Sequence, residues 1–160
     1  MTEKASEVIG LDLEHNKLEN AKKNFVQVIK ADASNLPFIN NSFETVWASE
    51  IIEHTPSLNT FGEIERIAKS KIIATVPNPN GPYIGKDPSH ILKYDLSTLT
   101  EFLQERDWKY SINGLGLCLP SGFFPKILRR IFVRLTWNHP QFSFNFLITG
   151  VSTSYNSSSH

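Results

Sequence analysis

Short runs of apolar and β-branched residues alternate along the chain with stretches in which apolar residues recur every three or four positions. The first pattern is typical of β-strands, and the second is typical of helices that pack through one face. Strands are predicted over residues 7–13, 25–31, 42–49, 71–76, 108–113 and 141–152. Helices are predicted over residues 14–24, 61–70, 96–106 and 123–136. This alternation predicts an α/β fold with a mainly parallel sheet covered by helices on both faces.

The 160 residues are enough for one hydrophobic core, and no repeat or linker divides the chain. We therefore expect a single domain over residues 1–152, followed by a flexible tail over residues 153–160. Residues 78–90 are rich in Gly, Pro and Asn and are expected to form a long surface loop, of the kind that often contributes to function.

Sixteen basic residues balance sixteen acidic ones, but residues 108–160 contain five basic side chains and no acidic one. The helix expected from Phe123 to Thr136 has four of these cations opposite an apolar face. Three uses of such a helix stay open: peripheral contact with an anionic membrane, a cover over a lipophilic substrate, and ordinary packing on the sheet. Nucleic-acid binding is not expected, because the chain contains no recognised binding module.

The sequence also bears on the compartment. No apolar run approaches the ~20 residues that cross a bilayer, and the first residues lack the pattern of an export signal. Cys118 is the only cysteine, which excludes an internal disulfide. A cytoplasmic location is therefore expected.

Polar side chains follow several of the predicted strands. Ligands of parallel α/β sheets bind beyond the carboxyl ends of the strands, so these residues are candidates for a functional site. Asp12 ends the first strand, where a carboxylate can accept hydrogen bonds from both hydroxyls of a ribose. The same position also suits a helix cap.

Glu50, Glu53 and His54 follow the third predicted strand at the spacing i, i+3 and i+4. If the chain turns helical there, the three side chains project from one face. Two carboxylates and one imidazole suit a divalent ion such as Mg²⁺ or Mn²⁺. Without a metal, His54 could act as a general base, contact a substrate or have a structural role.

Five segments occur together in an order that is hard to produce by chance. They are VIGLDL, ADASNLPF, SFETVWASEIIEH, IIATVPNPN and PSHILKYDLSTLTEF. Through them, roughly residues 5–115 of the chain resemble a class I S-adenosylmethionine-dependent methyltransferase, of the broad group that contains the ubiquinone-biosynthesis methyltransferases. The resemblance implies a Rossmann-like sheet, mainly parallel, with an antiparallel C-terminal strand.

The resemblance also implies a binding site for S-adenosylmethionine. Asp12 would bind the ribose hydroxyls, Leu13 would pack on the adenine, Asp32 and the Ala33 amide would read the adenine edge, and Ser49 and Glu50 would line the floor. An alternative for Asp32 is that its side chain only begins an Asx-turn in a polar loop.

In metal-dependent O-methyltransferases of ubiquinone synthesis and in small-RNA 2′-O-methyltransferases, which look similar at this point, the Glu-His group binds a metal. In the latter a further His follows the next strand, and His90 is the candidate for it. The resemblance thus implies Glu50, Glu53, His54 and His90 as ligands of Mg²⁺ or Mn²⁺, which would lower the pKa of a substrate hydroxyl. Related enzymes have the same Glu-His pair and no metal.

The glycine-rich turn that grips the methionine part of the cofactor has no counterpart in the chain. Residues 7–13 match the second strand of the family, so the first strand, which lies mid-sheet between the second and the fourth, is missing. Its absence would leave two inner strand edges unpaired. Direct pairing of the flanking strands, a second copy in a homodimer, or an N-terminal segment encoded upstream or separately could close this gap.

Two functions follow from the resemblance. The first is methyl transfer from S-adenosylmethionine to an oxygen or nitrogen of a small or lipophilic acceptor, with Glu53 and His54 as the catalytic residues. The second is a methyltransferase-like remnant that has lost catalysis and serves as a binding or oligomerisation module. The polar residues kept together at the predicted site favour the first, and the absent glycine-rich turn favours the second.

Overall fold

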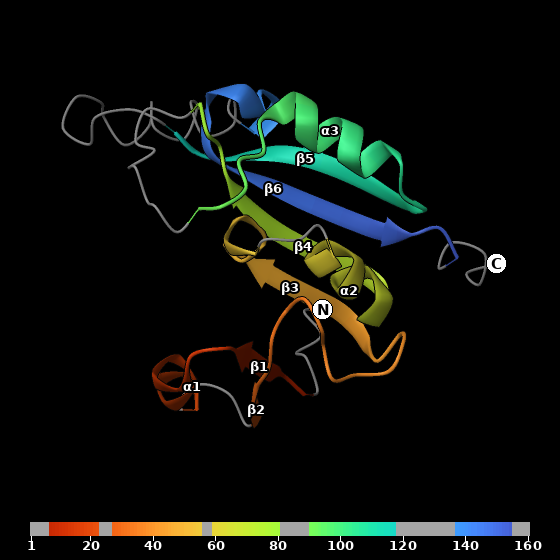
Figure 1. The fold of residues 1–160 in the computed structure, drawn as a ribbon. Coiled ribbons are helices and arrows are strands. Elements are labelled where there is room, and N and C mark those ends of the chain that lie inside the picture. Colours follow the sequence, from red (N-terminus) through yellow and green to blue (C-terminus); the bar gives the residue numbers. More distant parts are fainter. Residues whose placement is uncertain (1–6, 23–26, 56–58, 81–89, 118–136, 155–160) are drawn as a thin grey trace, which may run out of the picture.

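A computed structural model describes residues 7–22, 27–55, 59–80, 90–117 and 137–154 of the chain. Its elements are β1 (Ile9–Asp12), α1 (His15–Ala21), β2 (Gln27–Lys30), β3 (Phe43–Ser49), η1 (Ile52–His54), α2 (Asn59–Ile67), β4 (Ala68–Pro77), α3 (Leu96–Gln104), β5 (Trp108–Leu117), η2 (Pro140–Phe142) and β6 (Ser143–Ser152). The predicted α/β fold with alternating strands and helices is confirmed (Figure 1).

The strands form two sheets. One contains β1 and β2, and the other has the strand order β3-β4-β6-β5. Neighbouring strands are parallel in the pairs β1–β2 and β3–β4. β6 runs antiparallel to both β4 and β5, so β5 points in the same direction as β3 and β4. The prediction of a mainly parallel arrangement with an antiparallel C-terminal strand is therefore confirmed.

A gap separates the two sheets between β1 and β3. Each of these strands is paired on one side only, and neither has a second strand partner among the described residues. Figure 1 shows that β1 and β3 point their carboxyl ends toward the same side of the molecule. The sequence left open that the two flanking strands, β1 and β3, close the gap by pairing directly with each other. They do not pair in this fold.

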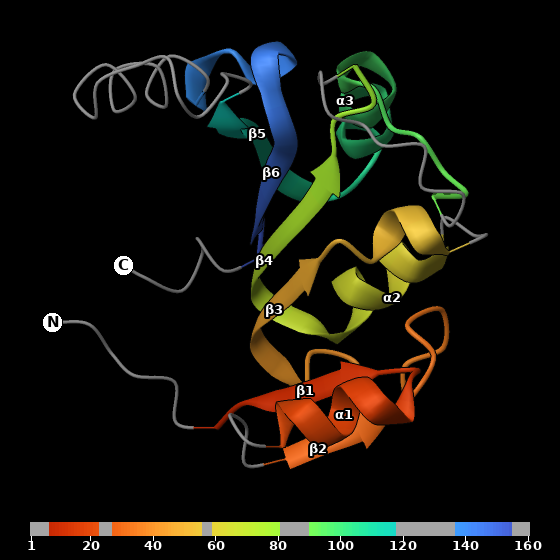
Figure 2. The ribbon, with the colours of Figure 1, turned by 90° about the vertical axis from the view of Figure 1, so that its left-hand side faces the viewer.

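The core lies between the four-stranded sheet and the helices α2 and α3, which cover the same face of this sheet (Figure 2). Apolar residues recur at helical spacing in both helices, and their buried side chains meet those of β4 and β6. The largest fully buried apolar side chains are Phe61, Ile72, Val76, Phe146 and Ile148. These contacts orient the strand ends at which the candidate site lies.

Trp47 points away from this core. Successive side chains of a strand face opposite sides of the sheet, and Val46 and Ala48 of β3 belong to the core. The Trp47 side chain in between is 74% exposed. Among the described residues, the helices that cover β3 lie on the face opposite Trp47.

The boundary between α2 and β4 differs from the prediction. Helical spacing predicts a helix as far as Ser70, but α2 ends at Ile67 and residues 68–70 already belong to β4. Ala68 is the parallel partner of Phe43 at the start of β3. Residues 68–70 are therefore held as a strand by backbone pairing with β3, which lies far away in the sequence. The local spacing of apolar residues contains no information about such pairing.

Three predictions fall outside the described residues: the helix from Phe123 to Thr136, most of the loop over residues 78–90, and the end of the C-terminal tail. Among the residues that are described, no helix is long and apolar enough to cross a membrane.

Candidate functional site

The predicted site residues lie at or just after the carboxyl ends of β1, β2 and β3. Asp12 is the last residue of β1, Asp32 follows β2, and Ser49 is the last residue of β3. The backbone hydrogen bond from Ala31 N to Asp12 O, 3.3 Å long, brings the ends of β1 and β2 together. In parallel sheets this is the edge at which ligands bind.

Both aspartates make local hydrogen bonds with the chain that follows them. Asp12 Oδ1 accepts from Glu14 N at 2.8 Å. Asp32 Oδ1 accepts from Ser34 N at 2.8 Å and from Ser34 Oγ at 2.7 Å, and these bonds lower the pKa of Asp32. The Asx-turn considered for Asp32 is therefore present, whereas the N-cap residue of α1 is Glu14 and not Asp12.

Leu13 and Ala33 follow the two aspartates. Leu13 is 61% exposed, so an apolar side chain lies on the surface at the end of β1. Ala33 is half-buried in the turn after β2. Both residues thus lie directly after an aspartate at a strand end.

Glu50 has a strained backbone. Its φ of 50° lies in the left-handed region, which costs a residue with a Cβ about 1 kcal/mol or more. Glu50 N donates to Thr75 O at 3.1 Å, and Glu50 Oε1 accepts from Asn145 Nδ2 at 3.2 Å. β4 and β6 thus hold the chain in the conformation that turns it out of β3 toward η1.

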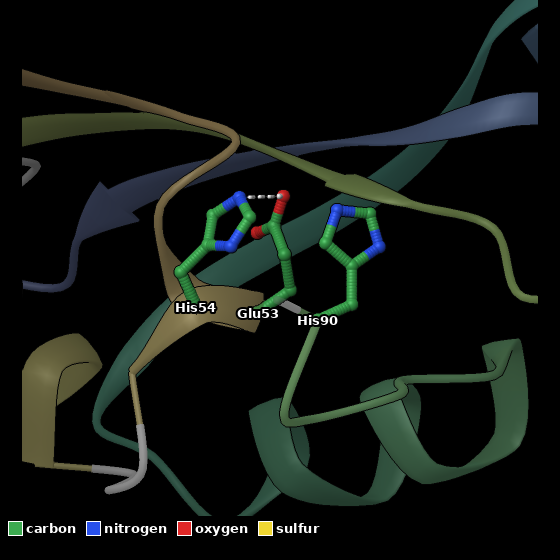
Figure 3. A group of neighbouring side chains, drawn as sticks. All are labelled: Glu53, His54 and His90. Atoms are coloured by element: carbon green, nitrogen blue, oxygen red, sulfur yellow. Dashed lines mark ion pairs between the residues drawn. The ribbon is translucent and has the colours of Figure 1, made fainter. Parts of the chain in front are cut away.

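Glu53, His54 and His90 form a compact group (Figure 3). One ligand atom from each side chain lies within 4.8 Å of the others. Glu53 and His54 belong to η1, and His90 is brought to them because Ile91 N and Leu92 N both donate to Glu53 O, at 2.9 and 3.0 Å. The backbone directly after His90 is therefore hydrogen-bonded to Glu53, and the His90 side chain lies beside the side chain of this same residue.

The Glu53 carboxylate is buried with little polar compensation. The residue is 1% exposed, and neither carboxylate oxygen has a hydrogen-bond partner in the described part of the chain. His54 Nε2 lies 4.0 Å from Glu53 Oε1. Burial raises the pKa of Glu53 to about 7, and the nearby charge of Glu50 raises it further, while His54 opposes the shift.

Tyr94 adds a buried hydroxyl to these surroundings. The side chain is 6% exposed, and its hydroxyl has no hydrogen-bond partner among the described residues. Burial raises the pKa of Tyr94, and the charge of Glu53 raises it further. Uncompensated polar groups of this kind are expensive in a core, so they are most often explained by a ligand or by water.

The arrangement therefore brings together three of the four predicted metal ligands. Glu53, His54 and His90 meet, whereas Glu50 lies outside this group and is engaged with Asn145. The reason is that η1 begins only at Ile52, so Glu50 precedes the helical turn on which the spacing i, i+3, i+4 relied. No sequence pattern points to Thr75, Tyr94 or Asn145, because their partners are distant along the chain.

The chemistry available to this group is the binding of a proton or a cation. A carboxylate with free oxygens beside two imidazoles can take a proton from a hydroxyl or an amine. The same donors can bind a divalent ion. Either occupant would satisfy the buried oxygens of Glu53.

Comparison with known proteins places this geometry in a family context. Residues 1–73 match the model of a methyltransferase domain. No curated protein matches the chain. Many solved structures share the fold, and several of them are S-adenosylmethionine-dependent methyltransferases.

Three of these structures illustrate the likeness. A SAM-dependent methyltransferase from Archaeoglobus fulgidus is 19% identical, with a TM-score of 0.59 over 90% of this chain and 75% of that one. A possible histamine N-methyltransferase from Thermotoga maritima is 16% identical, with a TM-score of 0.67 over 91% and 72%. A chain of the Haloferax volcanii complex between the Trm112 methyltransferase activator and a methyltransferase is 19% identical, with a TM-score of 0.70 over 94% and 73%.

Residues 1–73 thus resemble a methyltransferase domain, and the described residues have the fold of the S-adenosylmethionine-dependent methyltransferases.

Proposed function

We propose that the chain transfers a methyl group from S-adenosylmethionine to an oxygen or nitrogen of a small or lipophilic acceptor. The observation that carries this proposal is the group of Glu53, His54 and His90, in which a buried carboxylate that has no hydrogen-bond partner among the described residues lies beside two imidazoles. The group follows β3, at the edge of the sheet where ligands of this fold bind.

The residues at the strand ends fit the cofactor in their chemistry. Two carboxylates suit the ribose hydroxyls and the adenine amino group, and an exposed leucine suits the face of the adenine ring. When bound, S-adenosylmethionine supplies a methyl group on a positively charged sulfur. The residues that would hold it are Asp12, Leu13, Asp32, Ala33, Ser49 and Glu50.

Glu53 and His54 would handle the acceptor proton. An acceptor hydroxyl or ammonium group becomes nucleophilic when it loses a proton, and a base is most effective when its pKa lies near the working pH. The pKa of about 7 that burial imposes on Glu53 meets this condition. His54, with its side chain 36% exposed, could pass the proton on to solvent.

A divalent ion fits the same group. The two unpartnered oxygens of Glu53 and the imidazoles of His54 and His90 provide an oxygen and two nitrogen donors. Such a mixed set suits Mn²⁺ better than Mg²⁺, which prefers oxygen alone. An ion there would lower the pKa of an acceptor hydroxyl.

Manganese binding can be measured by titration of the purified chain with Mn²⁺ and detection of the free ion by electron paramagnetic resonance. We expect one bound ion, with at least about tenfold weaker binding in Glu53→Gln and in His90→Ala, because outright loss of one ligand costs this much or more. Glu101→Gln, which changes an exposed carboxylate of α3, is the matched control. No binding at millimolar Mn²⁺, or equal binding by wild type and Glu53→Gln, would refute the metal site.

The cofactor site can be tested through Asp12. Asp12→Asn keeps the oxygen that accepts from Glu14 N but removes the negative charge, so the local turn survives. We expect S-adenosylmethionine to bind the variant about 5- to 100-fold more weakly, through loss of charge-assisted hydrogen bonds. Equilibrium dialysis with labelled cofactor measures the change, with Glu14→Gln as the control. An unchanged affinity in Asp12→Asn would exclude its role at the ribose.

The gap between β1 and β3 would accommodate the strand and glycine-rich turn that the resemblance implies. A further strand between them would pair with both free edges and bring backbone close to the methionine part of the cofactor. A second copy of the chain or a polypeptide segment N-terminal to it could supply this strand. Hydrogen exchange of the β1 and β3 amides distinguishes the two, since protection that rises with protein concentration indicates a second copy and constant exchange contradicts it.

A further inference from the structure

Helix α2 has a polar face that is directed at the loop between β2 and β3. Asn59, Glu63 and Arg66 are spaced i, i+4 and i+7, which places them on one side of the helix. Each of the three bonds to residues 34–41, the part of this loop that follows Asp32. The opposite side of α2 contributes Phe61, Ile64 and Ile67 to the core, so the helix itself is firmly placed.

Arg66 makes most of these bonds. Its guanidinium donates to Phe38 O at 2.6 Å, to Leu36 O at 3.0 Å and to Asn40 Oδ1 at 3.1 Å. Its backbone carbonyl accepts from Asn41 N at 2.9 Å. The fixed fork of the guanidinium lets one side chain bond two carbonyls at the same time, which an amine cannot do in the same geometry.

Glu63 and Asn59 extend the contact. Glu63 Oε2 accepts from Leu36 N at 2.8 Å, and the same carboxylate binds Arg66 at 2.7 and 2.8 Å. The Arg66 guanidinium holds the pKa of Glu63 below its usual range. Asn59 Nδ2 donates to Ser34 O at 2.9 Å.

These bonds reach the proposed cofactor residue through Ser34. The backbone amide and the hydroxyl of Ser34 both donate to Asp32 Oδ1, while its carbonyl accepts from Asn59. Residues 31–42 contain no strand or helix of their own. A loop of this kind keeps one conformation only if tertiary contacts outweigh its conformational entropy, and here those contacts come from α2.

We propose that Asn59, Glu63 and Arg66 are positioning residues that set the affinity for S-adenosylmethionine by fixing the loop that contains Asp32 and Ala33, an inference that rests on the proposed cofactor role of these two residues. None of the three needs to touch the cofactor. Loss of the Arg66 side chain removes the donors of two loop carbonyls and of the Glu63 carboxylate, so the loop samples more conformations. It then spends less time in the conformation that binds the cofactor, and the apparent affinity falls.

The chain contains a matched control on the same helix. Glu65 of α2 pairs with Arg106, whose Nε lies 2.7 Å from Glu65 Oε2. The side chains of Arg106 and Glu65 are 23% and 14% exposed, against 29% and 14% for Arg66 and Glu63. This second pair ties α2 to Tyr110 of β5, where Tyr110 Oη donates to Glu65 Oε1 at 2.7 Å, and it has no bond to the loop.

The test compares Arg66→Ala, Arg66→Lys and Arg106→Ala with the wild type by calorimetric titration with S-adenosylmethionine. We expect Arg66→Ala to bind about tenfold more weakly, which corresponds to the loss of one or two hydrogen bonds. Arg66→Lys should recover part of this loss, because an ammonium can still reach one carbonyl. Arg106→Ala should keep the wild-type affinity within about twofold while it lowers the melting temperature.

Hydrogen exchange without cofactor supplies an independent readout. The amides of residues 34–41 should exchange faster in Arg66→Ala and not in Arg106→Ala. Equal exchange in the two variants, or a faster loop with unchanged cofactor affinity, overturns the positioning role. Failure of the wild type to bind S-adenosylmethionine would instead contradict the proposed function, and the expected effect of Arg66 on cofactor affinity would fall with it. The exchange rates would still show whether α2 fixes the loop.

Discussion

At the scale of single residues, Glu53 decides what the site can do. Its carboxylate is buried with no hydrogen-bond partner in the described part of the chain, next to His54 and His90. A charged carboxylate is unfavourable in this environment, so Glu53 either keeps its proton or binds a cation. Both outcomes agree with a site that handles the proton of an acceptor.

The burial of Glu53 has a measurable consequence for the pH dependence of folding. The pKa is raised to about 7 in the folded state, above its ordinary value of 4.5. The folded chain therefore binds the proton more tightly than the unfolded chain, and the free energy of unfolding falls as the pH rises from about 4.5 to about 7. The groups around this carboxylate are Glu50, His54, His90 and Tyr94.

Glu53→Gln removes the titrating carboxyl group, so the variant should not lose this part of its free energy of unfolding as the pH rises. We expect the variant to gain stability over the wild type as the pH rises from 5 to 8, by up to about 3 kcal/mol. Urea unfolding without metal, at several pH values, measures the difference, and Glu101→Gln serves as the exposed control. A difference that is constant across this range would show that the carboxylate does not titrate there.

Sequence predicted much of the site at this scale, and physical reasons explain what it missed. Glu53, His54 and His90 were predicted together and do meet. Glu50 was predicted with them but is held elsewhere by Asn145, which lies 95 positions away in the sequence. A contact across such a separation leaves no local pattern, and the positive φ of Glu50 leaves none either.

At the scale of elements, the prediction was most reliable where local and tertiary signals agree. A helix was predicted over residues 96–106, and α3 runs from Leu96 to Gln104 with Asp95 as its N-cap, where Asp95 Oδ1 accepts from Thr98 N at 2.8 Å. The end of α2 was predicted wrongly because β4 pairs with β3 from Ala68 onward. The polar face of α2 was not recognised, since its spacing is also that of an ordinary solvated face.

The close approach of β5 and β6 gives a prediction at this scale. A Cβ at Gly150 of β6 would overlap the Tyr110 ring, which its hydrogen bond to Glu65 holds in place. We expect Gly150→Ala to lower the free energy of unfolding by about 1 to 3 kcal/mol. In Gly62→Ala the new Cβ meets no atom closer than 3.6 Å, and this helical position should become more stable by about 0.5 to 1 kcal/mol.

Urea unfolding of the two variants provides the measurement. The two substitutions should change the free energy of unfolding in opposite directions. Alanine at position 62 reduces the conformational freedom of the unfolded chain, whereas alanine at position 150 creates a steric overlap in β6. A Gly150→Ala variant as stable as the wild type would show that Tyr110 can move aside, and the Glu65–Tyr110 hydrogen bond would then not fix the ring.

At the scale of the whole molecule, the chain consists of two sheets with a gap between β1 and β3. The sequence predicts an interruption of the sheet from the order of its segments, and β1 and β3 are not paired with each other. The edges of β1 and β3 that have no strand partner among the described residues present backbone groups with which any further strand could pair. In the proposed cofactor site, Asp12, Asp32 and Ala33 would serve the adenosine half, and the methionine half would lie at the gap.

Calorimetric titration of the purified chain with S-adenosylhomocysteine tests the central claim most directly, because this product contains the adenosine part and needs no acceptor. The expected result is saturable binding of one ligand per chain, weakened in Asp12→Asn and preserved in Glu14→Gln. Absence of binding at millimolar ligand would contradict an enzyme formed by this chain and would favour a methyltransferase-like module that serves in binding or assembly.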